Sequence, residues 1–306
     1  SFTTTGSSFL TRNFIVLRKL GEGDFGVVID VQCRCSSSKF AIKISKIKDP
    51  LKAKGLHYTR DNLNEVRAHT SIPPHPHLVR LFQAWKEGGH VYIHLELFME
   101  SLEVYWRRNN RISSGEMNNI LNDSLRAFRH LSFHNLVHLD IKPANILRNE
   151  KGVCKLADSS VTVNLKTHTS TFEFGDGRYS APELLRDNLF TPKADIYSLA
   201  ISLSQISTPA DEQLSMEQWK DLKEGRMTDR VKKALTRDVG RKVRSLLREH
   251  SYRPSAEDRL GENKENIVTE VVDHMYTFQR RERMCGRFSL SNTTEREMRE
   301  NVSPLM

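Results

Sequence analysis

Short apolar stretches that alternate with polar positions recur over the first hundred residues and predict a small β-sheet. β-branched and aromatic residues are frequent in these stretches, and polar or glycine-containing turns separate them, as is typical of antiparallel strands. The expected strands cover residues 14–17, 26–31, 39–44, 78–82 and 91–95. One helical pattern near residues 61–70 interrupts the series. This part of the chain is therefore expected to form five strands and one helix.

From about residue 100 onward, apolar positions recur at helical spacing. One helical face is expected to hold Met117, Ile120, Leu121, Leu125, Phe128 and Leu131. Two short strands are expected around residues 146–147 and 153–156, with a turn at Lys151–Gly152 between them. The pattern predicts an α+β protein, with a small antiparallel sheet domain over about residues 14–98 and a mostly helical domain over about residues 99–260.

Both ends of the chain are polar. Residues 1–13 are rich in Ser and Thr, lack the apolar segment of a signal peptide and are expected to form a flexible leader. Residues 261–306 are expected to form a mobile, charged tail with one helix near residues 269–278. The longest apolar stretches, such as Ile196 to Leu203, are too short to cross a bilayer, so no transmembrane segment is expected.

Composition narrows the class of protein. The 306 residues are 38% hydrophobic and 28% charged, which allows a sizeable core and disfavours global disorder. The net charge is +9, but the basic residues are scattered and no nucleic-acid-binding motif accompanies them. We therefore expect affinity for phosphates or an acidic protein surface and no nucleic-acid partner. The four cysteines have no zinc-site spacing and are interpreted as reduced thiols.

The stretch HLDIKPAN, from His138 to Asn145, carries candidate groups for phosphoryl transfer. Asp140 could accept or orient the proton of a substrate hydroxyl, and Lys142 could neutralise a γ-phosphate. Asn145 and Asp158 offer the oxygen ligands that Mg²⁺ prefers. Taken alone, Asp140 and Asn145 could simply form an Asx turn. The catalytic interpretation depends on whether the other parts of an ATP site follow in the right order.

A glycine-rich segment, GEGDFGVV, precedes this stretch. Glycine lets the backbone approach phosphate oxygens and present its N–H groups to them. A dinucleotide-binding turn has the same spacing but opens into a helix, whereas here β-branched residues continue as a strand and predict a hairpin lid. A hairpin without a ligand is the alternative. The candidate nucleotide-contacting residues are Gly21, Glu22, Gly23, Asp24, Phe25, Gly26 and Val28.

Lys43 follows on the strand Ala41-Ile42-Lys43, where it could contact the α- and β-phosphates. A lysine that points into a cleft needs a counter-ion, and Glu65 in the expected helix is the natural partner. Singly, both would be ordinary surface charges.

Three residues of the helical domain are expected to organise its structure. Ala181-Pro182-Glu183 matches the end of an activation segment, and Glu183 needs a buried cation, for which Arg253 is the candidate. Asp195 begins an apolar helix and is expected to tie its N-terminus to the catalytic loop.

With these motifs in order, residues 14–260 resemble a eukaryotic protein kinase. Three segments resemble the Wee/Myt family, whose members place inhibitory phosphates on cyclin-dependent kinases: Gln83–Gly89, His138–Asn145 with Leu139 in place of Arg, and Gly175–Glu183. The Ala-Pro-Glu triplet and the Gln-Ala-Trp segment are more similar to the Myt branch than to the Wee branch.

The resemblance implies a two-lobed protein kinase fold and the cofactors ATP and Mg²⁺. It implies a cyclin-dependent kinase–cyclin complex as substrate, phosphorylated on Thr and/or Tyr of its glycine loop, which would restrain entry into mitosis or meiosis. The hinge would meet adenine through the backbone of Glu96 and Phe98, with Leu95 as gatekeeper. The residues implied to sandwich the adenine ring are Leu20, Val28 and Ala41.

Three departures from the general kinase pattern modify these expectations. Leu139 replaces the arginine that reads activation-loop phosphate, which predicts activity without that phosphorylation. Asp158-Ser159-Ser160 replaces Asp-Phe-Gly, which keeps the Mg²⁺ ligand but loses the aromatic side chain. The membrane-spanning segment of Myt-type kinases is not found in residues 261–306, so a soluble nuclear or cytoplasmic protein is expected.

The tail contains short motifs. Lys264-Glu265-Asn266 resembles a signal for the anaphase-promoting ubiquitin ligase, Arg287–Leu290 has the R-x-x-L skeleton of a second one, and Ser303-Pro304 could be a phosphorylation site. For the whole chain, two alternatives to the Wee/Myt interpretation stay open: a weakly active or inactive kinase-like scaffold that binds cyclin–kinase complexes, and a Ser/Thr kinase with other substrates.

Overall fold

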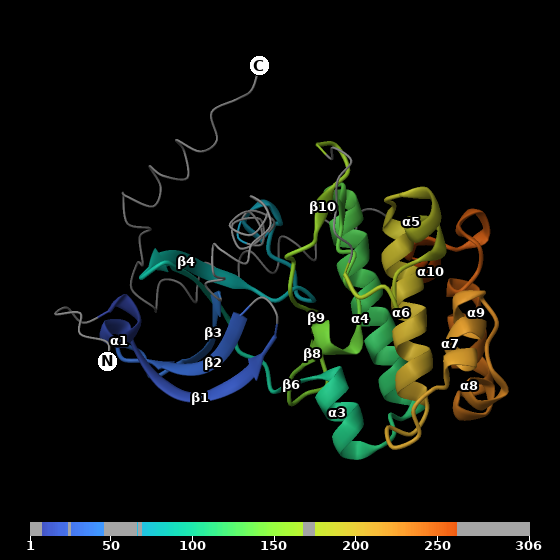
Figure 1. Cartoon of the computed structure of the whole chain (residues 1–306), viewed down its shortest axis with the longest axis horizontal. Coiled ribbons are helices and arrows are strands. Elements are labelled where there is room, and N and C mark those ends of the chain that lie inside the picture. Colours follow the sequence, from blue (N-terminus) through green and yellow to red (C-terminus); the bar gives the residue numbers. More distant parts are fainter. Residues whose placement is uncertain (1–7, 24–25, 46–65, 67–68, 168–174, 262–306) are drawn as a thin grey trace. The chain divides into compact units, whose positions relative to one another are not determined.

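The structure is a computed structural model that describes residues 8–23, 26–45, 66, 69–167 and 175–261 (Figure 1). The chain divides into two compact units. Among the described residues, the first unit contains residues 8–45 and 80–97, with a gap at 24–25, and the second contains residue 66, residues 69–79 and residues 98–261 with a gap at 168–174.

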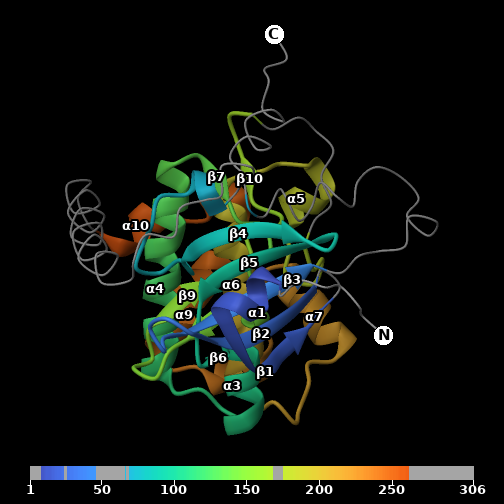
Figure 2. The same cartoon turned by 90° about the vertical axis from the view of Figure 1, so that its left-hand side faces the viewer.

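The first unit is built on a five-stranded antiparallel sheet with the strand order β1-β2-β3-β5-β4 (Figure 2). The strands are β1 (Phe14–Glu22), β2 (Gly26–Cys33), β3 (Lys39–Ser45), β4 (Leu81–Glu87) and β5 (His90–Glu96). The number of strands agrees with the sequence pattern. The fourth and fifth strands in space are in reversed sequence order, because β5 pairs with both β3 and β4.

Two features of the first unit differ from the sequence prediction. Helix α1 (Phe9–Asn13) occupies the last part of the expected flexible leader, where the Phe9 N–H donates to the Glu87 carboxylate at 2.9 Å and the Phe9 ring packs on Trp85. The strand expected at residues 78–82 is wrong in its position, because β4 begins only at Leu81. Leu78 instead forms an isolated bridge with Leu156 of the second unit.

The segment before β4 belongs to the second unit, although the predicted boundary at residue 98 placed it with the sheet. Backbone hydrogen bonds explain this difference. The Val79 N–H donates to the Leu156 carbonyl and the Leu156 N–H donates to the His77 carbonyl, both at 2.9 Å. Val66 and residues 69–71 are helical, while the rest of the helix expected at residues 61–70 lies outside the described residues.

The second unit is mostly helical. Its helices are α3 (Leu102–Asn109), α4 (Ser114–Phe133), η1 (Pro143–Asn145), α5 (Pro182–Asp187), α6 (Pro192–Ser207), α7 (Met216–Lys223), α8 (Asp229–Ala234), α9 (Arg237–Leu246), η2 (His250–Tyr252) and α10 (Ala256–Leu260). Its strands form two small sheets: β6 (Glu100–Ser101) with β8 (Ile146–Arg148) and β9 (Cys154–Leu156), and β7 (Leu136–Val137) with β10 (Val163–Asn164). The expected turn at Lys151–Gly152 lies between β8 and β9, where Gly152 has a φ of +80°.

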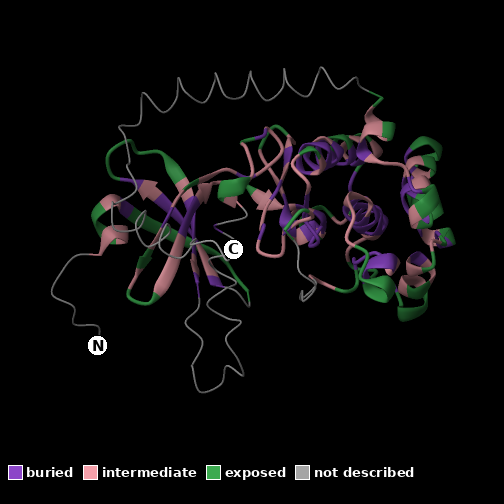
Figure 3. Cartoon of the chain, turned by 90° about the horizontal axis from the view of Figure 1, so that it is seen from above, coloured by how far each residue is buried: buried purple, intermediate pink, exposed green. Residues whose placement is uncertain are grey.

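The core of the second unit is formed chiefly by α4 and α6, where buried side chains are concentrated (purple in Figure 3). Helix α4 begins at a capping box in which the Ser113 hydroxyl and the Glu116 carboxylate each accept a backbone N–H of the other's residue. All six residues of its predicted apolar face are buried. Within the described part of the chain, no helix is both long and apolar enough to cross a membrane.

Candidate active site

The catalytic loop of the second unit is anchored by a buried carboxylate. Asp195 lies in the first turn of α6, and its two oxygens accept the backbone N–H groups of His138 and Leu139, each at 2.8 Å. Burial raises the pKa of Asp195, while these hydrogen bonds and the neighbouring His138 oppose the increase. The predicted link between this helix and the loop is therefore confirmed.

Leu139 has an unusual backbone conformation for a non-glycine residue, with a φ of +65°. Its side chain is 4% exposed and belongs to the core of the second unit. The strained φ is held by the Asp195 hydrogen bond on one side and by core packing on the other. Leu139 therefore turns an apolar side chain into the core at the position that an arginine usually occupies.

The structure brings together the three residues predicted in this loop. The Asn145 side-chain amide donates to Asp140 Oδ2 at 2.7 Å, and Lys142 Nζ lies 2.8 Å from the same oxygen. The Asn145 amide also donates to the backbone carbonyl of Asp140 at 2.9 Å. Asp140 is thus a 7% exposed carboxylate whose direction is fixed by neighbouring donors.

A further donor to Asp140 comes from a segment far away in the sequence. The Asp176 backbone N–H donates to Asp140 Oδ1 at 3.1 Å. The preceding residue, Gly175, lies so close that a Cβ there would be 2.3 Å from the same oxygen. Only glycine permits this approach without displacing the carboxylate. Sequence reasoning used Gly175 only as part of a family resemblance and did not find this contact.

The two predicted metal ligands lie at the same end of the β8–β9 pair. Ile146 pairs with Leu156, and the Ala157 N–H donates to the Asn145 carbonyl at 2.9 Å, so Asn145 and Asp158 flank this short ladder. Because the Asn145 amide nitrogen is used by Asp140, its amide oxygen is left as the candidate metal ligand. An amide oxygen and a carboxylate are hard donors that fit Mg²⁺.

Ser159 follows Asp158 at the position where most kinases carry a phenylalanine, and it makes a polar contact. Ser159 is 6% exposed, and its hydroxyl lies 3.4 Å from His69 Nε2. Asp158 itself has a φ of +62°, and one of its oxygens accepts the Ser160 N–H at 3.3 Å. The Asp-Ser-Ser segment is therefore anchored by hydrogen bonds rather than by a buried ring.

In the first unit, the glycine-rich segment forms the predicted hairpin between β1 and β2. The Gly23 N–H donates to the Gly26 carbonyl at 2.9 Å. Gly26 is required by packing, because a Cβ there would lie 2.3 Å from the Ile44 carbonyl oxygen, whereas Gly21 and Gly23 have open space around them. Glu22 ends β1, and Asp24 and Phe25 lie outside the described residues.

The residues implied to bind the nucleotide share one face of the first unit's sheet. Val28 pairs with Lys43 and Ala41 pairs with Leu95, and directly paired residues of antiparallel strands point to the same face. Lys43 is 8% exposed on this face. The partner predicted for it, Glu65, lies outside the described residues, so that ion pair stays a prediction.

The hinge residues are divided between the units. Glu96 ends β5 in the first unit, where its N–H donates to the Arg80 carbonyl at 2.9 Å. Phe98 begins the second unit, where Lys155 Nζ lies 5.5 Å from its ring. Leu20 lies in β1 and is 37% exposed.

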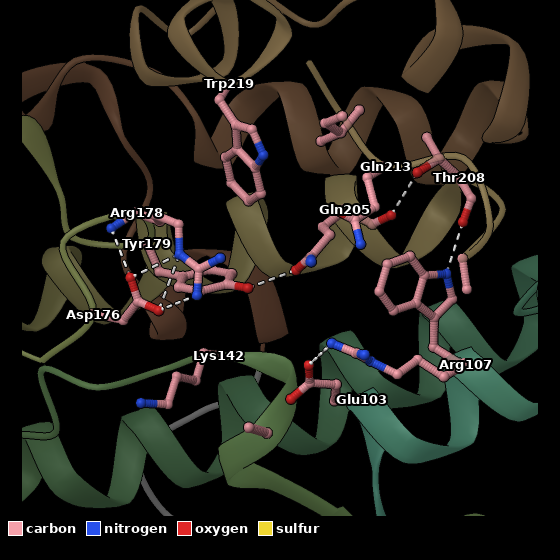
Figure 4. Close-up of a pocket in the computed structure, with 14 residues that line it drawn as sticks. Glu103, Arg107, Lys142, Asp176, Arg178, Tyr179, Gln205, Thr208, Gln213 and Trp219 are labelled. Atoms are coloured by element: carbon pink, nitrogen blue, oxygen red, sulfur yellow. Dashed lines mark hydrogen bonds and ion pairs between the residues drawn. The ribbon is translucent and has the colours of Figure 1, made fainter. Parts of the chain in front are cut away.

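A pocket of about 320 Å³ opens beside Lys142 in the second unit (Figure 4). It is lined by α3 on one side and by the Asp176–Tyr179 segment, Gln205 and Trp219 on the other. The Tyr179 hydroxyl donates to Gln205 Oε1 at 2.7 Å, and its ring packs edge-on against Trp219. Sequence reasoning did not find this pocket, because its walls come from segments that no motif connects.

Two ion pairs organise the segment from Gly175 to Glu183. Arg178 pairs with Asp176 at 2.6 Å in the pocket wall, and the arginine holds the pKa of that carboxyl below its usual range despite partial burial. Glu183 pairs with the buried Arg253, as the sequence predicted. Arg253 Nη1 also donates to the Lys193 carbonyl at 2.8 Å.

Comparisons with known proteins agree with this geometry. The family model described as protein kinase domain matches residues 14–285. The membrane-associated tyrosine- and threonine-specific cdc2-inhibitory kinase wee-1.3 of Caenorhabditis elegans is 32% identical over 260 residues, which are 84% of this chain and 37% of that protein. The corresponding kinase of Drosophila melanogaster is 33% identical over 267 residues, 86% of this chain and 49% of that protein.

The mitosis inhibitor protein kinase wee1 of Schizosaccharomyces pombe is 28% identical over 254 residues, 81% of this chain and 28% of that protein. The chain thus spans less than half the length of these three relatives. The family match itself covers most of the chain and contains every predicted site residue. The chain therefore belongs to the protein kinase family.

Proposed function

We propose that this chain is an ATP- and Mg²⁺-dependent protein kinase that phosphorylates Thr and/or Tyr in the glycine loop of a cyclin-dependent kinase. The observation that carries the catalytic part of the proposal is the set of donors around Asp140: the Asn145 amide, the Lys142 ammonium group and the Asp176 backbone N–H. They leave a fixed carboxylate beside a cation, which is the arrangement that phosphoryl transfer to a hydroxyl requires.

The proposed mechanism assigns each step to a residue of this chain. Asp140 orients the substrate hydroxyl and takes its proton as the oxygen attacks the γ-phosphorus. Lys142 neutralises the charge of the transferring phosphoryl group, and the Asn145 amide oxygen and Asp158 are placed to hold Mg²⁺. ATP supplies the phosphoryl group and leaves as ADP. Lys43, on the sheet face shared with Val28 and Ala41, would hold the α- and β-phosphates.

The substrate part of the proposal rests on the relatives. Two of them are described as tyrosine- and threonine-specific cdc2-inhibitory kinases, and a third as a mitosis inhibitor. The Gly175–Glu183 segment, which resembles this family, supplies both the donor to Asp140 and one wall of the pocket. We therefore propose that the chain restrains mitotic or meiotic entry, and that it is closer to the Myt branch.

The test is transfer of radiolabelled phosphate from ATP to a catalytically dead cyclin-dependent kinase bound to its cyclin. We expect Asp140→Asn and Lys43→Arg to reduce transfer at least about a hundredfold. The exposed residues Asp187 and Lys151 provide matched controls as Asp187→Asn and Lys151→Arg, which should behave as wild type. Mapping the labelled residue then separates Thr from Tyr specificity. Equal signal from the wild type and both site variants would refute the enzyme interpretation.

A kinase-like scaffold is the second candidate, because Ser159 contacts His69 where most kinases carry a phenylalanine. On this alternative the chain would bind the cyclin–kinase complex and ATP without turnover. Measuring ATP binding and transfer on the same preparation distinguishes the two candidates. Binding without transfer above the Asp140→Asn background would favour the scaffold.

The cellular part of the proposal rests on sequence alone. We propose a nuclear or cytoplasmic location, and recognition by a ubiquitin ligase through Lys264-Glu265-Asn266, which lies outside the described residues. Replacing these three residues with alanine should lengthen the half-life of the protein at mitotic exit. An unchanged half-life would exclude the motif as a degradation signal.

A further inference from the structure

The last residue of α7 reaches across to the segment that contacts Asp140. Lys223 Nζ donates to the carbonyl of Gly177 at 2.8 Å and to the carbonyl of Ser180 at 2.5 Å. The two carbonyls flank Arg178 and Tyr179, which line the pocket of Figure 4. One ammonium group thus closes a four-residue turn whose side chains form the pocket wall.

The helix end that carries Lys223 is itself fixed. The Tyr197 hydroxyl of α6 contacts the carbonyls of Leu222 and Lys223 at 3.3 and 3.0 Å. The Leu222 side chain is fully buried in the core. Lys223 therefore extends from a rigid base, whereas Lys220 on the same helix is exposed to solvent.

The other end of the turn is held by Asp140. The Asp176 N–H donates to Asp140, and the Asp176 carbonyl accepts the Tyr179 N–H at 2.9 Å and the Ser180 hydroxyl at 3.3 Å. The turn is consequently fastened at two points, to α7 through Lys223 and to the catalytic carboxylate through its own backbone.

Burying the Lys223 ammonium group costs desolvation free energy. A residue that only stabilised the fold would not need to carry this charge. Among the described residues, the Lys223 ammonium group donates only to neutral carbonyls, and burial lowers the pKa of Lys223 to about 8, with only Asp176 acting in the opposite direction. The acids next to it on its own helix end, Asp221 and Glu224, pair with Arg226. A leucine or methionine of similar length would fill the same space without this desolvation cost.

We propose that Lys223 is a positioning residue for the protein substrate. It holds the Gly177–Ser180 turn so that the pocket wall keeps its shape and the Asp176 N–H stays on Asp140. Lys223 thereby determines how well a bound polypeptide presents its hydroxyl to the carboxylate, without touching the reacting atoms. The inference rests on the proposed kinase activity but not on the identity of the substrate.

The test compares steady-state kinetics of the whole chain carrying Lys223→Met, Lys223→Arg or the control Lys220→Met. The substrates are the catalytically dead cyclin–kinase complex and, separately, casein as a generic protein. We expect Lys223→Met to raise the KM for protein substrate about tenfold, since two charge-assisted hydrogen bonds are lost. The KM for ATP should change less than about twofold, since the hydrogen bonds of the Lys223 ammonium group to described residues all go to the turn. Lys223→Arg should retain most activity, because a guanidinium can also donate to two carbonyls.

A pH profile adds a readout that a purely structural role would not change. Between pH 7 and pH 9 the wild-type KM for protein substrate should rise as the Lys223 ammonium group loses its proton near pH 8. The Lys223→Arg variant should show no such rise, because arginine stays protonated. Titration of the substrate or of Tyr197 and Asp176 would affect both proteins equally.

Two outcomes would overturn the inference: unchanged kinetics in Lys223→Met, or parallel losses in thermal stability, ATP KM and protein KM that Lys223→Arg does not relieve. If the cyclin–kinase complex is not phosphorylated but casein is, the substrate proposal fails while the comparison of variants on casein still decides the role of Lys223. If neither protein is phosphorylated by the wild type, the kinase proposal fails and the inference fails with it.

Discussion

His94 is a buried histidine whose protonation should control the acid stability of the first unit. It lies in β5 among the rings of Phe14, Phe40 and Phe82, whose centroids are 5.1, 4.4 and 5.0 Å from its own. Neither of its ring nitrogens has a hydrogen-bond partner among the described residues. Burial lowers the pKa of His94 from its ordinary value of 6.5 to about 4. The folded protein therefore holds this side chain neutral.

The sign and size of the effect follow from linkage. Between pH 6.5 and pH 4 the unfolded chain binds a proton at His94 that the folded chain does not bind. The stability associated with the neutral ring is fully present above pH 6.5 and is lost as the pH falls toward 4. With these two values, lowering the pH from 7 to 5 costs about 2 kcal/mol of unfolding free energy from this residue alone.

The assay is urea unfolding followed by circular dichroism, at pH 7 and at pH 5, for the wild type and His94→Phe. We expect the wild type to lose about 2 kcal/mol more than the variant on acidification, because phenylalanine does not titrate. His130 in α4 has a pKa of similar value, about 4, but it is present in both proteins and its contribution cancels. Tyr92→Phe, in the same strand, is the control and should keep the wild-type loss. Equal acid sensitivity of the wild type and His94→Phe would refute the reasoning.

Three further substitutions test other contacts of the second unit. Gly175→Ala should reduce kcat about a hundredfold with little change in the KM for ATP, because its Cβ displaces the Asp140 carboxylate; wild-type kcat in a transfer assay would contradict this. Glu183→Gln should cost about 3–5 kcal/mol in urea unfolding, since the buried Arg253 loses its counter-charge; a loss below about 1 kcal/mol would show that other groups compensate. Asp195→Asn removes one of two acceptors for backbone N–H groups and should lower both the free energy of unfolding, by about 1–3 kcal/mol, and kcat. An unchanged kcat would show that catalysis does not depend on the anchoring of the loop by Asp195.

Secondary structure that depends on residues close together in the sequence could be predicted. The β1–β2 hairpin follows from glycines beside β-branched residues, and the apolar face of α4 follows from 3.6-residue spacing. The Glu183–Arg253 pair could be predicted because Ala181-Pro182-Glu183 matches a known motif whose carboxylate needs a buried cation. The strand near residue 80 was placed three residues too early, since Leu78 is apolar but bonds to Leu156 rather than to the sheet.

Contacts between distant backbone groups could not be predicted in this way. The Asp176 N–H that binds Asp140 belongs to no side chain, and its position depends on how the chain returns to the loop. Lys223 appears in the sequence as one surface lysine among many, and nothing in its neighbours indicates two carbonyl partners 43 and 46 residues away. Such contacts become visible only when segments without mutual sequence signals are placed in space.

The buried leucine of the catalytic loop has a consequence for how such an enzyme would be regulated in a cell. Leu139 occupies its position with its side chain sealed in the core, so the loop offers no cation there that a newly added phosphate could attract. In the proposed kinase, an upstream enzyme could not activate catalysis by adding a phosphate that pairs with a cation at this position. Control would then have to act at another place, for instance on the rates at which the protein is made and destroyed.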